Sequence, residues 1–218
     1  MKIALITPVG PNHKEIYQEC LKSINDAWNY SHGPFSNIEI IAMWDLEGKY
    51  GRSARRNAGI NLAIKRKCEW IFFIDADDLM SQFAFNEITE YIEKYDAIWG
   101  GILEANINDK HSLKIRENQL IFTEDISDIL NYDPYLTLQM GHFVKTSCLS
   151  EIRFDITMNT GEDFKYYLEI WSKYKCAKVE KIFFLNRRGF HSQGPKSANG
   201  KDWRDAVQKQ IDQMLAFR

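Results

Sequence analysis

Three carboxylates follow an apolar run in the first half of the chain. Trp70–Ile74 has the pattern of a buried strand, and Asp75, Asp77 and Asp78 come directly after it. Crowded carboxylates repel one another unless a cation or a network of donors offsets the repulsion, and such hard oxygen ligands suit Mg²⁺ or Mn²⁺. The pattern therefore predicts a divalent-metal site that a nucleoside diphosphate would complete. The alternative is that these acids cap a following helix, because Asp is a favoured N-cap residue.

Alternating strand and helix patterns surround this site. Residues 2–9 and 38–44 are apolar runs that stop at Pro, Gly or Asp, which is typical of buried strands. Apolar residues at spacings of three and four predict helices over 14–28 and 53–67. The remaining predictions are helices over 81–94, 127–132, 147–152, 162–174 and 201–217, strands over 97–103 and 178–185, and a polar hairpin or excursion over 107–122.

This order of elements predicts the fold class. Alternating strands and helices favour an α/β fold with a mainly parallel sheet flanked by helices on both faces. In such sheets, ligands bind beyond the carboxyl ends of the strands. Thr7, Asp45 and Asp75 each lie near the end of a predicted strand. We therefore expect them to converge at one edge of the sheet.

The composition indicates a soluble, folded protein. The 218 residues can bury a core as one domain over 1–218, and 44% hydrophobic and 27% charged residues are ordinary values. The net charge of -2 gives no general attraction to nucleic acid or anionic membranes. No apolar run approaches the length of a membrane span, so we expect a cytoplasmic protein. The four cysteines lie far apart without a CxxC pair, which indicates reduced thiols.

Several segments taken in order carry a family resemblance. They are the opening Lys2–Pro8, Asp45 after the second predicted strand, the block Gly51–Ile60, the Asp-x-Asp pattern at Asp75–Asp77, and the pair Phe154–Asp155 and Gly161–Asp163. Together they make the chain resemble the family 2 glycosyltransferases. The resemblance implies the GT-A fold with a Rossmann-like sheet. It also implies metal-dependent, inverting transfer of a sugar from a nucleoside diphosphate sugar to an acceptor hydroxyl.

The resemblance divides the chain into two parts. Residues 1–105 correspond to the donor half, and residues 106–218 correspond to the acceptor half with the closing elements. A UDP-sugar is favoured as the donor because UDP is the commonest nucleotide in this family. The acceptor stays open between a glycan, a glycolipid, a protein and a modified nucleobase.

The resemblance also implies a set of metal-binding and donor-binding residues. Asp77 would be the main ligand of Mn²⁺ or Mg²⁺, with Asp75 beside it, and His191 would complete the shell from a loop near the C-terminus. Arg56 occupies the matching motif position at a helix start, where backbone N–H groups and guanidinium groups favour phosphate, whereas Arg52 fits a solvated helix start. The expected donor-binding residues are Thr7, Pro8, Asp45, Arg55, Arg56, Asp75, Ala76 and Arg188.

The acceptor half supplies the expected base. Asp163 would remove the proton of the acceptor hydroxyl, and Glu162 would orient the acceptor or the loop. A carboxylate at a helix start is held by backbone donors, which favours its ionised form. The alternative is that both acids only cap the helix. Large buried aromatics are usually core, but we expect three residues of this half and of the preceding strand to lie near the acceptor: Trp99, Phe143 and His142.

Other functions place similar carboxylates after a strand. A phosphatase of the haloacid dehalogenase type has its Asp-x-Asp after the first strand, whereas here it follows the third predicted strand. A metal-dependent nucleotidyltransferase usually has a Gly-rich basic loop after the first strand, and residues 8–14 are a poor match. A catalytically inactive module that binds a nucleotide sugar is the non-enzyme alternative, against which Asp77 and Asp163 count.

Overall fold

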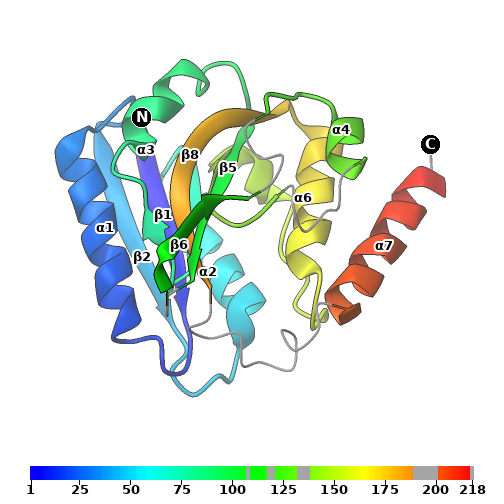
Figure 1. Cartoon of the computed structure of the whole chain (residues 1–218), viewed down its shortest axis with the longest axis horizontal. Helices are drawn as coiled ribbons and strands as arrows, with labels where there is room; N and C mark the ends of the chain where they lie inside the picture. Colours follow the sequence, from blue (N-terminus) through cyan, green and yellow to red (C-terminus); the bar gives the residue numbers. More distant parts are fainter. Residues whose placement is uncertain (107–108, 117–120, 132–137, 189–200, 217–218) are drawn as a thin grey trace.

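The computed structural model describes residues 1–106, 109–116, 121–131, 138–188 and 201–216 (Figure 1). Within these residues, eight strands form a single sheet in the order β2-β1-β3-β7-β5-β8-β4, with β6 paired to β5. The strands are β1 (Lys2–Val9), β2 (Asn37–Trp44), β3 (Trp70–Phe73), β4 (Leu79–Met80), β5 (Ala97–Asn106), β6 (Asp109–Ile115), β7 (His142–Lys145) and β8 (Cys176–Arg188). The helices are α1 (Ile16–Tyr30), α2 (Gly51–Lys65), α3 (Ala84–Glu87), α4 (Ile126–Leu130), α6 (Glu162–Lys173) and α7 (Lys201–Ala216), with 3-10 helices η1 (Ile88–Glu90) and η2 (Thr146–Ser150).

Most strands of the sheet run in the same direction. β1 pairs in parallel with β2 and β3, and β5 pairs in parallel with β8. β7 lies antiparallel between β3 and β5, so β5 and β8 share the direction of β1, β2 and β3. The expected α/β class with a mostly parallel sheet is therefore confirmed. Within the hairpin or excursion expected over 107–122, the described residues form the strand β6, which pairs with β5, the strand that precedes this range.

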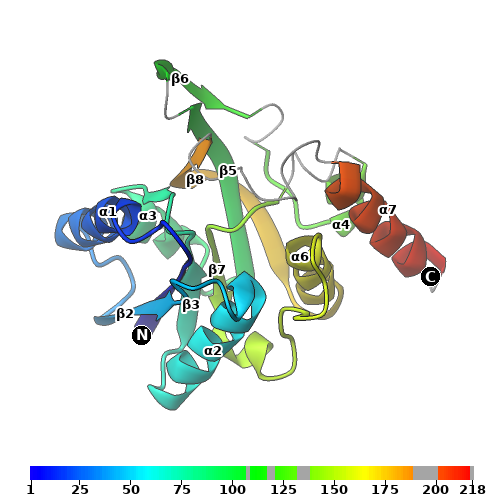
Figure 2. The same ribbon diagram turned by 90° about the horizontal axis from the view of Figure 1, so that it is seen from below.

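Helices cover both faces of this sheet because the strands are apolar on both sides. In β1, Ala4 and Ile6 face one hydrophobic cluster, and Ile3 and Leu5 face the other, as the period of two requires. The first cluster includes residues of α2 and α6, and the second includes residues of α1 and α3. Figure 2 shows these two helix layers on opposite sides of the sheet.

Some predicted elements differ from the structure. The expected helix over 81–94 is wrong, because this segment forms only the short helices α3 and η1, followed by turns. The β-branched Ile88 and Thr89 lower helix propensity, and burial of Phe85 and Ile88 holds the short turns in the core. The expected helix over 147–152 is the 3-10 helix η2. β7 was not predicted, because its four residues are too few to show a period of two.

Two further expectations concern the cysteines and the membrane. Cys20, Cys68, Cys148 and Cys176 are all buried and free, as expected for reduced thiols. In the described parts of the chain, the helices are too short or too polar to cross a membrane.

Candidate active site

A pocket of about 370 Å³ lies beyond the carboxyl ends of β1, β2 and β3. Its wall is made by the loop after β1, the connection from β2 to α2, the first turns of α2 and the loop after β3. Asp45 and Asp75 meet in this wall, as the sequence predicted. The lining residues are Pro8, Val9, Gly10, Pro11, His13, Asp45, Gly48, Gly51, Arg52, Arg55, Asp75, Ala76 and Asp77.

Asp75 is tied to α2 by an ion pair. Its Oδ1 accepts a hydrogen bond from Nη2 of Arg56, whose side chain is 3% exposed. Burial acts to raise the pKa of Asp75, but the charge and the hydrogen bond of Arg56, together with the charges of Arg52 and His13, outweigh burial and hold this pKa below its usual value. Asp75 therefore brings a negative charge to the pocket, and a buried guanidinium fixes its orientation.

Asp77 and Asp78 have different surroundings. Asp77 lines the pocket, whereas Asp78 is buried and accepts hydrogen bonds from the backbone N–H of Arg187 and from Nδ2 of Asn186. Burial, followed by the charges of Asp77 and Asp75, raises the pKa of Asp78 well above its usual value. Asp78 thus connects the loop after β3 to the end of β8. The alternative that these acids cap a helix finds no support, because no side chain caps α3.

Asp45 organises the entry into α2. Its two carboxylate oxygens accept hydrogen bonds from the backbone N–H groups of Lys49, Tyr50 and Gly51 at 2.8–2.9 Å. Burial acts to raise the pKa of Asp45, but these N–H donors outweigh it and lower the pKa. Asp45 therefore shapes this wall of the pocket through the backbone.

The three arginines at the start of α2 have separate contacts. Arg55 lines the pocket, and its guanidinium carbon lies 4.0 Å from the ring centroid of Tyr50. Arg56 is 2% exposed and lies behind the pocket wall. Arg52 lines the pocket, and its Nε donates a hydrogen bond to Oε1 of Glu162. The expectation that Arg52 is only a solvated helix start is therefore wrong, because its guanidinium bridges two segments.

Glu162 is a buried partner of this bridge. Its side chain is 1% exposed, while that of Arg52 is 45% exposed. Burial acts to raise the pKa of Glu162, but the charge and the hydrogen bond of Arg52, together with the charge of Arg56 and a backbone hydrogen bond, outweigh burial and lower the pKa. In the described part of the chain, Oε2 of Glu162 is buried without a hydrogen-bond partner. Glu162 thus holds Arg52 at the pocket and keeps one buried acceptor atom.

Asp163 follows in the first turn of α6. Its Oδ1 accepts hydrogen bonds from the backbone N–H of Phe164 at 2.8 Å and from Nε1 of Trp203 at 3.2 Å. Burial and the charge of Glu162 raise the pKa of Asp163 above its usual value. We expected the helix start to favour the ionised form, but burial outweighs the donors. Neither acid occupies the N-cap position, which belongs to Gly161.

The sequence and the fold of this chain resemble those of known proteins. Residues 35–159, more than half of the chain, match the family described as glycosyl transferase family 2. The chain belongs to glycosyl transferase family 2. The match includes the pocket residues from Asp45 to Asp77 and ends just before the acidic pair of α6. A search of curated proteins gave no match.

Solved structures agree with the family 2 assignment at the level of the fold. S. aureus TarS 1–349 is 16% identical with a TM-score of 0.63, and the match covers 86% of this chain and 60% of TarS 1–349. Its complex with UDP-GlcNAc is 14% identical with a TM-score of 0.65, over 97% of this chain and 66% of the other. A197 from STIV is 15% identical with a TM-score of 0.50, over 83% and 82%. At such low identities, the structural likeness shows a shared fold and nothing beyond the fold.

The other residues expected at the donor site of this family 2 protein are placed as follows. Pro8 and Ala76 line the pocket. Thr7 is fully buried in β1, with its Oγ1 lacking a hydrogen-bond partner among the described residues, so it supports the wall from behind. Arg188 ends β8, and its side chain lies outside the described residues, as does the whole of His191.

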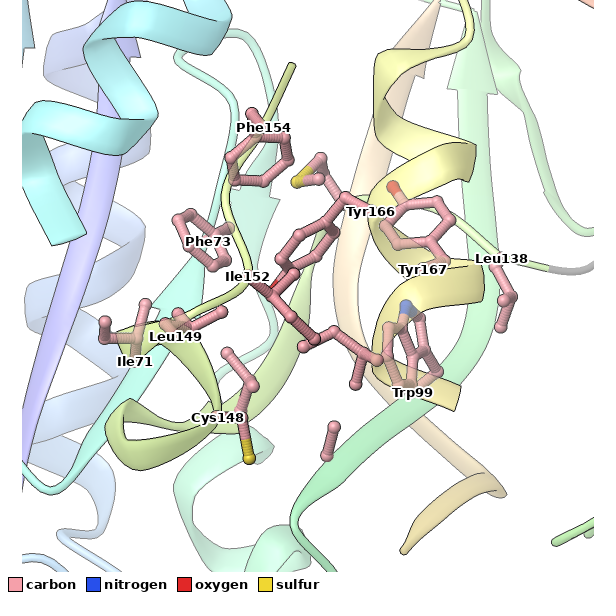
Figure 3. Packing of buried hydrophobic residues seen from close by; sticks show 14 of the residues in the cluster. Ile71, Phe73, Trp99, Leu138, Cys148, Leu149, Ile152, Phe154, Tyr166 and Tyr167 are labelled. Atoms are coloured by element: carbon pink, nitrogen blue, oxygen red, sulfur yellow. The ribbon is translucent and has the colours of Figure 1, made fainter. Parts of the chain in front are cut away.

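The three aromatic residues expected near the acceptor lie inside the core. His142 is fully buried and stacks on Trp99, with ring centroids 4.5 Å apart, while its Nε2 lies 3.2 Å from the hydroxyl oxygen of Tyr166. Burial lowers the pKa of His142 to about 3. Figure 3 shows Trp99 packed beside Tyr166 and Tyr167. Phe143 is fully buried against the other face. Contact of these rings with an acceptor is therefore not supported by the packing.

The carboxylates of the pocket fit a cation that arrives with a diphosphate. Nowhere in the described ranges do three or more His, Cys, Asp or Glu side chains form a group that could hold a metal ion. Asp75 and Asp77 do line one pocket. Mg²⁺ is usually bound by one or two carboxylates together with substrate phosphates, and Asp75 and Asp77 match that requirement. The geometry favours this mode over a preformed cage of protein ligands.

Three residues of the site were missed from the sequence. His13 lines the pocket from the loop after β1, and burial lowers its pKa although Asp75 acts to raise it. His13 follows a predicted strand closely, and this position could have indicated from the sequence that it lies at the pocket. Arg52 lies in the motif block of α2, where the motif position favoured Arg56 over it. Trp203 contacts Asp163 across 40 residues of sequence, so no local pattern could reveal it.

Proposed function

We propose that this chain transfers a sugar from a nucleoside diphosphate sugar to an acceptor hydroxyl, with inversion, and that the donor is a UDP-sugar. The observation that carries the proposal is the Arg52–Glu162 ion pair, which joins the pocket wall to the acids of α6. A diphosphate in the pocket would therefore lie beside a candidate base. The crystal structures of S. aureus TarS with UDP and with UDP-GlcNAc support a uridine donor by likeness of fold.

The pocket charges suit the diphosphate of such a donor. Arg52 and Arg55 present guanidinium groups, which bind phosphate oxygens through paired hydrogen bonds. Asp75 and Asp77 would hold Mn²⁺ or Mg²⁺ together with the phosphates. A bound divalent cation would offset the negative charge that grows on the departing diphosphate. Arg56 keeps Asp75 ionised and oriented for this task.

Asp163 is the residue that we assign as the base. Its carboxylate takes the proton of the acceptor hydroxyl while the hydroxyl oxygen forms a bond to the anomeric carbon of the sugar. The bond from that carbon to the diphosphate oxygen breaks, and its electron pair leaves on the nucleoside diphosphate. The raised pKa of Asp163 makes the ionised carboxylate a stronger base. Glu162 holds Arg52 beside the leaving group.

Thermal unfolding with a panel of UDP-, GDP- and dTDP-sugars, with and without Mn²⁺, tests the donor site. One nucleotide class is expected to raise the unfolding temperature of the wild type in the presence of metal. A ligand at one hundred times its Kd adds about 2.7 kcal/mol to the free energy of unfolding. The effect should be lost in Asp77→Ala, because this variant removes a carboxylate from the pocket.

Asp26→Ala is the matched control for this panel. Asp26 is an exposed acid of α1 that pairs only with Lys22 in the described residues, so the variant should respond to donors like the wild type. Absence of stabilisation by every nucleotide sugar, with every metal, would overturn the proposal. Equal stabilisation of the wild type and Asp77→Ala would remove Asp77 from the metal site.

A further inference from the structure

The C-terminal helix α7 packs directly against the start of α6. Figures 1 and 2 show α7 on the outer side of α6, away from the sheet. The ring of Trp203 lies 6.1 Å from that of Phe164 between centroids, and Val207 is 1% exposed. Nε2 of Gln210 donates a hydrogen bond to the carbonyl oxygen of Gly161 at 3.1 Å. Trp203 and Gln210 lie two turns apart, so one face of α7 makes these contacts.

The approach of α7 to Gly161 leaves little room for a side chain. Gly161 has a φ of +74°, and a Cβ added there would lie 3.1 Å from Cβ of Ala206 and 3.2 Å from Nε2 of Gln210. The backbone conformation favours glycine, and a larger residue would have to displace α7 by a few tenths of an ångström. As a result, α7 is seated on the residue that immediately precedes the acidic pair.

One member of this helix face touches the candidate base. Nε1 of Trp203 donates a hydrogen bond to Oδ1 of Asp163 at 3.2 Å, and the backbone N–H of Phe164 donates to the same oxygen at 2.8 Å. Two donors on one oxygen restrict rotation of the carboxylate. Within the described chain, both of the hydrogen bonds that Asp163 accepts end on Oδ1, which leaves Oδ2 for another proton.

We propose that Trp203 is a positioning residue for the base: its indole N–H holds Oδ1 of Asp163, so that Oδ2 takes the proton of the acceptor hydroxyl. This inference rests on the proposed function of Asp163. General-base catalysis requires the carboxylate oxygen within hydrogen-bond distance of the proton that it removes. A donor that fixes one oxygen supplies this orientation, and an uncharged indole does so without adding a cation.

The charged and titratable groups around Asp163 come from two helices. Glu162 and Tyr167 lie on α6, and Arg52 reaches it from α2. On α7, the neighbours of Trp203 in sequence, Asp202 and Arg204, are exposed. Trp203 is uncharged, so a substitution there removes the contact of α7 with the Asp163 carboxylate without changing any charge.

Titration of Asp163 by carbon-13 NMR of its carboxyl group tests this contact without any substrate. The signal is assigned by its loss in Asp163→Asn. Trp203→Phe keeps an aromatic ring but removes the N–H, and it is expected to raise the pKa of Asp163 by about half a unit to one unit. Trp28→Phe is the matched control, because Trp28 is a half-buried tryptophan on α1, and it should leave this pKa unchanged.

A second variant separates the hydrogen bond from the docking of α7. Gln210→Met removes the bond to the Gly161 carbonyl but keeps the indole N–H of Trp203. It is expected to lower the unfolding temperature without moving the pKa of Asp163. Both variants can lower the unfolding temperature, but only Trp203→Phe should raise the pKa of Asp163.

Turnover supplies the second readout. Hydrolysis of the sugar nucleotide, with water as the acceptor, should show an acidic limb in its pH profile that moves to higher pH in Trp203→Phe. We expect kcat to fall by about 3- to 30-fold with the donor KM changed by less than about twofold, because orientation of the base contributes to the chemical step. An unchanged Asp163 pKa in Trp203→Phe would overturn the inference. A raised pKa without turnover of any sugar nucleotide would overturn the proposed function instead, and the positioning role with it.

Discussion

At the scale of single residues, the ion pairs around the pocket join a buried partner to a more exposed one. The side chain of Arg56 is 3% exposed, and that of its partner Asp75 is 35% exposed. In the Arg52–Glu162 pair the buried member is the acid. A buried charge without its partner is far less stable than an exposed one, so the two members of each pair should respond differently to removal.

The Arg56–Asp75 pair gives a test of this asymmetry. Asp75→Ala is expected to lower the free energy of unfolding by about 3 to 5 kcal/mol, because it leaves the buried guanidinium of Arg56 without its carboxylate partner. Arg56→Met should cost about 1 to 3 kcal/mol, because water can reach the remaining Asp75. Urea denaturation of both variants and of the double variant measures these values. The reverse order of the two single variants would contradict the burial assigned to Arg56.

Asp163 is the residue on which the proposed chemistry depends. Asp163→Asn is expected to lower the transfer rate by about 10²- to 10⁴-fold, because the amide cannot accept the acceptor proton. Its affinity for the nucleotide sugar, measured by calorimetry, should stay within about twofold of the wild type, because Asp163 lies outside the pocket lining. Asp26→Asn is the control for an acid on α1. Loss of both transfer and donor affinity would assign Asp163 a structural role.

At the scale of elements, a glycine with a positive φ lies at the start of both α2 and α6, as the first residue of α2 and as the residue just before α6. Gly51 has a φ of +78° and Gly161 has a φ of +74°. Each glycine turns the chain so that the first residues of its helix face the site, with Arg52 after one and Glu162 after the other. The two differ in their neighbours, because α7 contacts Gly161, whereas a Cβ on Gly51 would meet nothing within 4 Å.

Alanine at these two glycines separates backbone strain from helix contact. Gly51→Ala is expected to lower the free energy of unfolding by about 1 to 2 kcal/mol, the cost of a left-handed conformation for an L-residue. Gly161→Ala should lower it by at least about 1 kcal/mol more, because its new methyl group also crowds α7. Chemical denaturation measures both values. Equal losses would indicate that α7 does not press on Gly161.

At the scale of the whole molecule, the sheet brings together residues from distant parts of the chain and buries polar aromatic groups behind them. The strand ends form the pocket, while α6 and α7 supply the acids and the indole from beyond residue 160. Behind them, His142 lies fully buried among the rings of Trp99, Tyr166 and Tyr167. Folding therefore takes a titratable ring out of water.

This buried histidine predicts a pH dependence of stability. His142 has a pKa of about 3 in the folded chain, against about 6.5 for an ordinary histidine. Between these values the unfolded state binds the extra proton, so the free energy of unfolding falls as pH decreases below about 6.5, with a limiting slope of about 1.4 kcal/mol per pH unit. Urea denaturation at pH 4 to 7 measures the slope.

His142→Phe should flatten this dependence, because phenylalanine binds no proton, even if the variant is less stable at pH 7. His32→Phe is the matched control. His32 also stacks on a tryptophan, Trp28, with ring centroids 4.0 Å apart, but it is exposed to water in the folded chain. An unchanged slope in His142→Phe would show that other groups produce the pH dependence.

Local patterns in the sequence were enough to predict most of the sheet and the location of the pocket. Apolar runs that end at Pro, Gly or Asp marked β1, β2 and β3, and parallel strands carry their ends to one edge. Asp45 and Asp75 therefore meet where expected. The acids of α6 were found by motif order, and the C-terminal helix by its spacing of apolar residues.

Only the tertiary structure decided which side chains face the pocket and how they are charged. Arg52 bonds to Glu162 across 110 residues, and Trp203 bonds to Asp163 across 40, so neither contact leaves a trace in local spacing. The pKa of Asp163 rises rather than falls because burial and the charge of Glu162 outweigh Arg52 of α2 and Trp203 of α7, which act to lower it. Sequence periodicity determines which face of an element is apolar. The partners of a polar side chain depend on how whole elements pack, and this packing is fixed only in three dimensions.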